Sequence, residues 1–447
     1  MKDITKEAKP AKVAEMSKQA GEAQIRERWK WAEPSVWTER MLRALEEGVK
    51  GGKWFSLMDK VYASGNLNAA WEKVKGNKGA AGVDNQSIGA FQANKERYLE
   101  ELEISLKEDR YEAKPVKRVW IPKLGSKEKR PLGIPVVKDR ILQTALRNVM
   151  EPIFEKTFAQ QSYGFRPGRG CKDALRRVET MLGAGRQWVV DADIRSYFES
   201  IPHDKLMNDI KEQVADGRVL KLIAGYLKQG VMDGLDLWEP ERGTPQGAVV
   251  SPLLANIYLN KIDHAMSGLG YEMVRYADDF VIMCFSEEEA KKALAEVKVR
   301  IEERGLALHP EKTRIVDVSR GFDFLGYHFE RNTRWPRNKS MDKLKDTVRR
   351  KTKRTSGQSM AYIINDLNRS LKGWFEYFRH SEKSVFLKTD RWIRVRLRSI
   401  LRKRHGLKGR GRGFDNIKWP NAYFGGLGLF TLTAAHESAY QSRCGNH

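Results

Sequence analysis

The stretch Tyr276-Ala277-Asp278-Asp279 decides the fold, because two adjacent carboxylates stand between two apolar runs, Met273-Val274 before them and Phe280–Met283 after them. This pattern predicts a strand, a tight turn and a second strand, with the acids at the turn. Two neighbouring like charges are costly to bury unless a cation compensates them, so the pattern favours a hard divalent ion such as Mg2+ at the turn. The alternative is an exposed Asp-Asp hairpin turn without a ligand.

A second acidic strand precedes this hairpin in the chain. From Trp188 to Ile194 the apolar residues point one way, while Asp191 and Asp193 point the other. A template-copying polymerase needs two Mg2+ ions about 3.5 to 4 Å apart, held by carboxylates from separate strands. The two acidic segments meet that requirement, although the alternation alone does not choose between Asp191 and Asp193.

The net charge of the chain points to nucleic acid as its partner. Of the formal charge of +24, a surplus of +20 lies between residues 331 and 420, where 27 Lys and Arg stand against 7 Asp and Glu. Such an excess of positive charge favours binding to a nucleic-acid backbone, because the binding releases the counterions condensed on its phosphates. A solvated basic surface is the alternative.

The composition predicts a soluble protein of two to four domains. The 447 residues are 40% hydrophobic, and no apolar run approaches the roughly 20 residues of a membrane span. The three cysteines are far apart, which indicates neither a disulfide framework nor a zinc site. Since the N-terminus lacks the layout of a secretory signal, we expect a bacterial-type cytoplasmic location and no membrane association.

Local patterns predict strands interleaved with helices up to about residue 330 and almost only helices beyond it. Asn66 is a plausible cap for a helix that runs to Val74, and a further helix is expected over about 86 to 107. Ser286 and Glu289 form a capping box at the start of a helix that stops at Gly305. The fold class that follows is α+β.

With these elements in place, the chain resembles reverse transcriptases of the group II intron maturase type from about residue 66 to 440. Seven motifs carry the resemblance in the family's order. They are Ile121-Pro122-Lys123 through Lys129-Arg130-Pro131-Leu132-Gly133-Ile134-Pro135, Ser162–Arg169 (SYGFRPGR), Asp193–Phe198 (DIRSYF), Gly243–Gly247 (GTPQG), Ser251–Asn256 (SPLLAN), Tyr276–Asp279 (YADD) and Phe324–Tyr327 (FLGY).

The resemblance implies the ligands of the metal site. Asp193 and Asp278 would bind both Mg2+ ions, Asp279 would complete the acidic site, and Ile194 would offer its backbone carbonyl. Mn2+ is a possible substitute. The motif match selects Asp193, where the alternation left Asp191 open.

The resemblance also implies contacts to the nucleotide. Lys123 and Arg130 would grip the triphosphate, with Lys129 as the alternative to Arg130. Phe198 would clash with a ribose 2′-hydroxyl and so favour dNTPs, the alternative being an ordinary core aromatic. Gln246 would contact the template–primer beside the incoming nucleotide.

Two further residues are expected beside the template. Gly247 would permit a close backbone approach. Arg166 would position the template strand, while Phe165 is as well explained by the core as by a contact.

The basic C-terminal region predicts a helix with two faces. Arg391, Arg394, Arg398 and Arg402 fall at i, i+3, i+7 and i+11, and Ile393, Leu397, Ile400 and Leu401 supply the packing side. An apolar helix face is also expected over 361–378. The arginine stripe suits a phosphate backbone better than a solvated surface. This region resembles the family's thumb and maturase domain, which binds intron RNA and assists splicing.

The resemblance implies a right-hand polymerase architecture, with fingers and a palm built on an antiparallel sheet, followed by an all-helical thumb and maturase domain. We expect an N-terminal basic helical extension over 1–60, fingers and palm over 61–335, the thumb and maturase domain over 336–405, and a basic tail without an endonuclease domain over 406–447.

The expected function is RNA-directed DNA polymerisation with a role in the splicing and mobility of a group II intron. The expected partners are the intron RNA, an RNA template with a DNA primer, target DNA and dNTPs, and a homodimer is left open. The alternatives are a splicing-only maturase and a domesticated relative in phage defence or beside a CRISPR array.

Overall fold

The computed structural model describes residues 23–122, 129–409 and 413–444, and it confirms the α+β class. The chain forms two compact units. One contains the residues up to Ala174 together with Ala192–Ile282 and Lys291–Thr313, and the other contains Leu175–Asp191, Met283–Ala290 and the residues from Arg314 onward. No helix within the described ranges is long and apolar enough to cross a bilayer.

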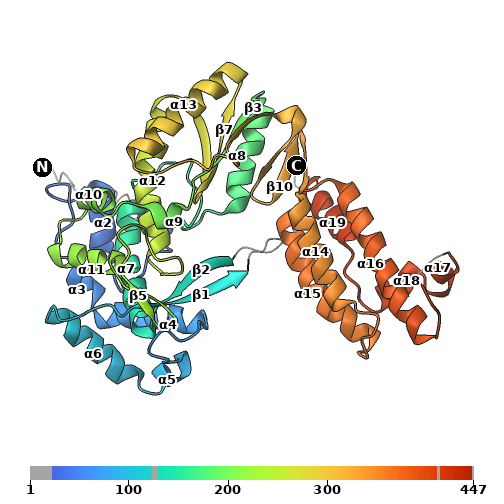
Figure 1. Ribbon diagram of the computed structural model, residues 1–447, viewed down its shortest axis with the longest axis horizontal. Helices are drawn as coiled ribbons and strands as arrows, with labels where there is room; N and C mark the ends of the chain where they lie inside the picture. The colour runs from blue at the N-terminus through green and yellow to red at the C-terminus, as the bar shows by residue number, and fades with distance from the viewer. Residues whose placement is uncertain (1–22, 123–128, 410–412, 445–447) are drawn as a thin grey trace, which may run out of the picture. The chain divides into compact units, whose positions relative to one another are not determined.

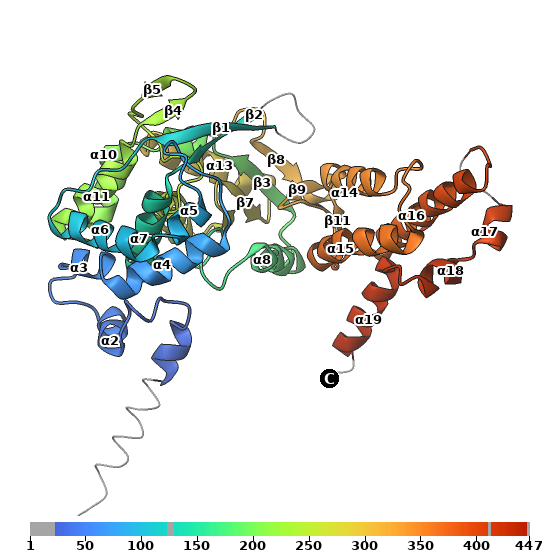
Figure 2. The ribbon, with the colours of Figure 1, turned by 90° about the horizontal axis from the view of Figure 1, so that it is seen from below.

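The first unit is built around helix α7 (Val137–Glu155), which is buried on most of its circumference. Helix α4 (Ser64–Gly76) packs along it (Figure 2). The other helices that lie wholly in this unit are α2 (Glu39–Glu47), α3 (Met58–Val61), α5 (Ile88–Gln92), α6 (Lys95–Lys107), α9 (Tyr197–Ser200), α10 (His203–Lys211), α11 (Gly217–Leu227) and α12 (Ser251–Gly268).

A four-stranded sheet in the first unit contains a long hairpin. Strands β1 (Val116–Pro122) and β2 (Lys129–Ile134) pair antiparallel, as Figure 1 shows. Strand β4 (Val231–Asp233) lies antiparallel to β5 (Asp236–Trp238) and pairs with β1 in parallel over two residues, so the sheet is mostly antiparallel with one parallel pairing. The hairpin from β4 to β5 turns at Gly234, whose φ of 65° requires the left-handed region.

A second four-stranded sheet carries the acidic motifs. Its order is β6-β7-β3-β8, where β6 is Glu272–Tyr276, β7 is Asp279–Cys284, β3 is Trp188–Asp193 and β8 is Arg314–Asp317. Helix α8 (Cys171–Gly183) precedes β3 in the chain, and helix α13 (Glu287–Glu303) connects β7 to β8. The expected capping box is confirmed, because the Glu289 amide donates to Ser286 Oγ at 3.1 Å and the Phe285 amide donates to Glu289 Oε2 at 2.7 Å.

The second unit contains a small sheet followed by helices. Strand β10 (Tyr327–Glu330) pairs antiparallel with β9 (Phe322–Phe324) and β11 (Thr333–Pro336), after a 3-10 turn over Val318–Arg320. The helices are α14 (Asn338–Lys351), α15 (Met360–Phe378), α16 (Lys383–Arg404), α17 (Phe414–Lys418), α18 (Asn421–Gly426) and α19 (Leu432–Cys444).

Helix α15 confirms the apolar face expected over 361–378. Both Ile363 and Ile364 are buried with Leu367 and Leu371, and the Ser359 hydroxyl caps the helix by accepting from the Tyr362 amide at 3.2 Å. Figures 1 and 2 show α14 and α15 side by side, and one apolar core joins α14, α15 and α16.

Two local predictions were wrong. Asn66 does not cap α4, which begins at Ser64. The Asn66 side chain is fully buried and donates to the carbonyl oxygens of Lys60 and Ala145, so tertiary contacts replaced the cap. The helix expected over 86–107 is two helices, because the chain leaves helical geometry at Asn94.

Candidate active site

The hairpin predicted from the acidic motif is present. Strand β6 ends at Tyr276 and β7 begins at Asp279, so Ala277 and Asp278 form the turn. Ala277 has a φ of 59°, which places a non-glycine residue in the left-handed region. Such a backbone conformation costs free energy and persists only where surrounding contacts hold it.

Those contacts come from Arg275, which lies on β6 and is 2% exposed. Its guanidinium donates to Asp263 Oδ1 at 2.7 Å, to Asn256 Oδ1 at 3.1 Å and to Ser162 Oγ at 2.8 Å. A further bond of 2.9 Å runs from Arg275 Nη1 to the Ala277 carbonyl oxygen. A buried arginine therefore fixes the backbone that presents Asp278.

Three motifs meet behind the turn. Asn256, from the SPLLAN motif, donates to the Gly164 carbonyl oxygen at 2.8 Å. Gly164, from the SYGFRPGR motif, lies so close to the Ala277 amide that a Cβ at this position would overlap the turn. The sequence requires glycine at 164 because the backbones touch there.

Asp193 ends β3, and its backbone carbonyl accepts from the His309 amide at 2.7 Å. Its side chain is 22% exposed and forms an ion pair with the ammonium group of Lys312. Ile194 follows, is 3% exposed, and forms an isolated bridge with Leu308. Asp191, two residues earlier on β3, forms an ion pair of 2.9 Å with Arg314 on the neighbouring strand β8.

Asp278 has a raised pKa. Burial is the main cause, the nearby negative charge of Asp193 adds to it, and the positive charges of Arg130 and Lys312 oppose it. The two carboxylates therefore lie within each other's electrostatic field, although 85 residues separate them in the chain. Like charges placed together at the ends of neighbouring strands leave a site that favours a cation.

The described residues hold no group of three or more His, Cys, Asp or Glu side chains gathered closely enough for a metal ion. The structure thus couples Asp193 with Asp278 but does not assemble all three aspartates as one ready cluster. Asp279 is the first residue of β7 and follows Asp278 directly. Oxygen ligands from Asp193 and Asp278 suit a hard divalent cation.

An aromatic group lies beside the acids. The Phe165 ring centroid is 6.4 Å from that of Phe198 and 6.4 Å from that of Tyr276. Phe198 is half-buried, and Phe165 is 44% exposed with a φ of 57°. Since neither ring is fully covered, both have surface available for a ligand.

The motif Gly243–Gly247 is tied to the β1–β2 hairpin. The Gly133 amide donates to the Gln246 carbonyl oxygen at 2.6 Å, and a Cβ at Gly247 would meet the Gly133 oxygen at 2.5 Å. Gly247, whose φ is 104°, therefore permits a close approach of the protein's own strand β2. A contact of Gly247 with the template stays a prediction.

The residues expected at the triphosphate are described only in part. Arg130 lies on β2, is exposed, and contributes to the field at Asp278. Lys129, the alternative to Arg130, begins the same strand. Lys123 lies outside the described residues.

Arg166, which was expected beside the template, is bound within the protein. It is 6% exposed, makes bonds of 2.6 to 3.1 Å to the Glu155 carboxylate, and donates to the carbonyl oxygens of Ala159 and Ser162 at 2.6 and 2.8 Å. Four of the five N–H donors of this guanidinium are directed to acceptors within the protein, so Arg166 shapes the loop. Phe165 is the exposed neighbour.

The four arginines of α16 divide into two pairs. Arg398 is 4% exposed and donates to the Trp419 carbonyl oxygen at 2.9 Å, while Arg402 grips the Asp415 carboxylate with two bonds of 2.9 Å. These two arginines hold α17 and α18 against α16, so their guanidinium groups already have partners within the protein. Arg391 and Arg394 have no ion pair within the described part of the chain, so the available stripe is shorter than expected.

Two residues of the site were missed from the sequence. Arg275 gave a signal, since it is a lone cation inside an apolar strand, where a charge needs a buried partner. The sequence around Lys312 contains no such signal. Its contact with Asp193 joins residues that are 119 positions apart in the chain.

Two family models match consecutive parts of the chain. A family model described as reverse transcriptase (RNA-dependent DNA polymerase) matches residues 121–329, and one described as group II intron, maturase-specific domain matches residues 341–419. Protein YkfC of Escherichia coli (strain K12) is 32% identical over 344 residues, which are 68% of this chain and 86% of that protein.

Other similarities cover less or are weaker. The group II intron-encoded protein LtrA of Lactococcus lactis subsp. cremoris is 38% identical over 196 residues, which are 43% of this chain and 32% of LtrA. The chain thus spans about a third of that relative. A solved structure of telomerase from Candida albicans matches with a TM-score of 0.41 at 12% identity, over 70% of this chain and 64% of that one. On the family models and the YkfC match, the chain belongs to the reverse transcriptases, RNA-directed DNA polymerases, and to the group of them that carries a group II intron maturase domain.

Proposed function

We propose that the chain extends a DNA primer along an RNA template, using dNTPs, at a site formed by Asp193 and Asp278. The observation that carries this proposal is the pairing of these carboxylates at the ends of β3 and β6, where each raises the electrostatic cost of the other's charge. Lys312 pairs with Asp193, yet burial and the charge of Asp193 still raise the pKa of Asp278. Two carboxylates that remain in each other's field in this way suit a role in binding cations.

The residues present fit a pair of divalent ions. Asp193 and Asp278 would hold them, with Asp279 and the Ile194 carbonyl as further oxygen ligands, and Mg2+ is the expected metal with Mn2+ as a substitute. When bound, such ions lower the pKa of the primer hydroxyl and neutralise charge on the triphosphate. The Lys312 ammonium neutralises Asp193 without metal, so it must give way when a cation binds.

The surrounding side chains would select the nucleotide. Arg130, with Lys123, would hold the triphosphate through charge-assisted hydrogen bonds. The half-buried ring of Phe198 would stand against C2′ of the incoming sugar and exclude a hydroxyl there, and Gln246 would contact the nascent base pair. Arg275 would contribute by keeping the turn at Ala277 fixed, which holds Asp278 in place.

The basic second unit would bind RNA. We propose that residues 336–405 act as thumb and maturase domain on group II intron RNA, after fingers and palm over 61–335, and that the intron reaches a DNA target through this activity. Support comes from the surplus of +20 between residues 331 and 420 and from Arg391 and Arg394 on α16. Phosphate contacts of this kind give affinity without sequence preference.

The test is extension of a labelled DNA primer annealed to an RNA template, with Mg2+ and either dNTPs or rNTPs. We expect full-length product with dNTPs only, and Phe198→Ala should admit rNTPs while leaving dNTP extension measurable. Leu235→Ala, a substitution of a fully exposed side chain in the turn between β4 and β5, serves as the matched control. Failure of the unmodified chain to extend the primer with dNTPs would reject the proposal.

A further inference from the structure

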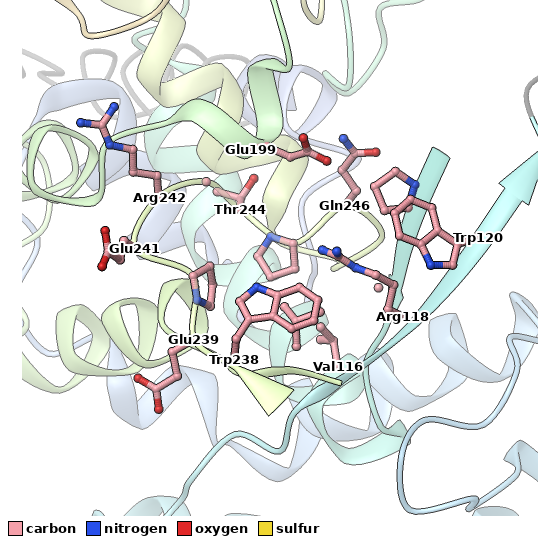
Figure 3. A pocket seen from close by; sticks show the side chains of 16 residues that line it. Val116, Arg118, Trp120, Glu199, Trp238, Glu239, Glu241, Arg242, Thr244 and Gln246 are labelled. Carbon is pink, nitrogen blue, oxygen red and sulfur yellow. The ribbon is translucent and has the colours of Figure 1, made fainter. Parts of the chain in front are cut away.

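A cavity of about 680 Å3 lies between the β1–β2–β4–β5 sheet and the loop that contains Gln246 (Figure 3). Val116, Arg118 and Trp120 project into it from alternate positions of β1, and Trp238 projects from the end of β5. Its volume falls within the roughly 300 to 1,000 Å3 typical of small-molecule sites.

The cavity contains an arginine between two indole rings. The Arg118 guanidinium carbon lies 4.4 Å from the Trp238 ring centroid and 5.5 Å from that of Trp120, and Figure 3 shows Arg118 between them. The Trp120 indole N–H donates to Asp233 Oδ2 at 3.0 Å, which fixes the orientation of the ring. The rings are nevertheless 44% and 38% exposed. Oriented but uncovered aromatic rings form a stacking surface.

The charges in the cavity disfavour a phosphate. Three glutamates (Glu199, Glu239 and Glu241) line it against two arginines, Arg118 and Arg242. A triphosphate or backbone phosphate placed there would meet a net negative lining. A neutral base suits the cavity better, because it stacks on aromatic rings and its amino groups can donate to carboxylates.

The cavity adjoins the proposed polymerase site. Glu199 directly follows Phe198 in the chain, and the Thr244 amide donates to the Phe198 carbonyl oxygen at 2.6 Å. Gln246, proposed above as a contact of the nascent base pair, lines the same cavity. The two indole rings therefore line the same cavity as the residue proposed to contact that base pair.

We infer that this cavity takes an unpaired base of the RNA template, ahead of the position being copied. The base stacks against Trp120 and Trp238 beside Arg118, and its phosphates remain outside. This inference rests on the proposed polymerase function, because it requires a template strand. It gives the β4–β5 hairpin a role in holding the template that neither the family models nor the acidic motifs assign.

The experiment compares two RNA–DNA hybrids of identical duplex sequence, one blunt and one with a 5′ RNA overhang that carries 2-aminopurine. Binding is measured by anisotropy and stacking by quenching of the 2-aminopurine fluorescence. Trp120→Ala and Trp238→Ala should each weaken overhang binding about tenfold and relieve the quenching, with blunt-hybrid binding unchanged. The Trp→Phe variants should retain most of the binding, and Leu235→Ala on the same hairpin should match the unmodified chain.

The outcomes separate the two proposals. The inference is overturned if the unmodified chain extends primers but the tryptophan variants bind the overhang, and quench its fluorescence, as strongly as the unmodified chain. The exposed rings would then be surface for contact with a protein. Equal weakening of both hybrids would also overturn it, because it would indicate a general structural effect. If the unmodified chain extends no primer on RNA, the proposed function fails, and the template inference fails with it.

Discussion

Arg275 Nη1 donates a hydrogen bond of 2.9 Å to the carbonyl oxygen of Ala277, two residues further along the chain. The same guanidinium is paired with Asp263, which is fully buried. The turn that presents Asp278 is therefore held from inside the protein by an ion pair that water does not reach.

The first prediction concerns this ion pair. Arg275→Met should lower the free energy of unfolding by about 3 to 5 kcal/mol, because it leaves Asp263 buried and unpaired. Denaturation by urea measures the change. The double variant Arg275→Met with Asp263→Leu should recover most of the stability but not primer extension, since the Ala277 carbonyl still lacks its donor. Full activity in the double variant would show that Arg275 stabilises the fold without positioning the turn.

The second prediction concerns Lys312, whose ammonium group occupies the Asp193 carboxylate in the absence of metal. Lys312→Gln should tighten Mn2+ binding at pH 8, because the cation no longer competes with a fixed positive charge. Calorimetric titration with Mn2+ measures this. Lys221→Gln removes a comparable exposed ion pair, with Asp109, and should leave Mn2+ binding unchanged. Unchanged or weaker binding in Lys312→Gln would contradict the competition.

The third prediction concerns Asp139, which is fully buried at the start of α7 and accepts hydrogen bonds from Tyr111 and from Gln229. Burial raises its pKa to about 7, although these bonds oppose the shift. The folded state thus binds a proton that the unfolded state releases near pH 4. The contribution of this group to stability falls as pH rises from about 4 to 7, by at most about 4 kcal/mol.

Asp139→Asn should remove that pH dependence. Urea denaturation at pH 5 and pH 8 should give a smaller difference between the two conditions for the variant than for the unmodified chain. An equal difference in both proteins would mean that Asp139 is ionised in the folded state at both pH values.

The fourth prediction concerns the shortened cationic stripe. Arg391→Gln with Arg394→Gln should weaken RNA binding and reduce the slope of log K against log salt by about 1.4 to 1.8, the share of two phosphate contacts. Lys292→Gln with Lys298→Gln, two exposed positions on α13, removes the same charge and should leave the slope near its original value. Equal slopes in both double variants would show that Arg391 and Arg394 do not contact RNA phosphates.

The sequence predicted those features that depend on local pattern. The hairpin at Asp278, the capping box at Ser286 and the apolar face of α15 follow from periodicity and from side-chain chemistry within a few residues, and the structure confirms each of them. The coupling of Asp193 with Asp278 needed the motif match in addition, because alternation along β3 treats Asp191 and Asp193 alike.

The features that the sequence did not predict depend on contacts between residues that are far apart in the chain. The stripe on α16 has the right spacing for phosphate binding, yet Arg398 and Arg402 are taken up by Trp419 and Asp415 from a later part of the chain. Arg166 is likewise occupied by Glu155. A charge pattern shows where cations lie on a helix or loop, but not which of them the fold neutralises.

The central claim is that Asp193 and Asp278 form the site of nucleotide transfer, and Asp278→Asn tests it most directly. Extension of a DNA primer on RNA with Mg2+ should fall below detection, while binding of the same hybrid stays near its original affinity, and Asp346→Asn on α14 should retain full extension. The metal-free variant should also unfold at a higher temperature than the unmodified chain at neutral pH, because burial raises the pKa of Asp278 and makes its charge costly. Extension by Asp278→Asn at the unmodified rate would contradict the account.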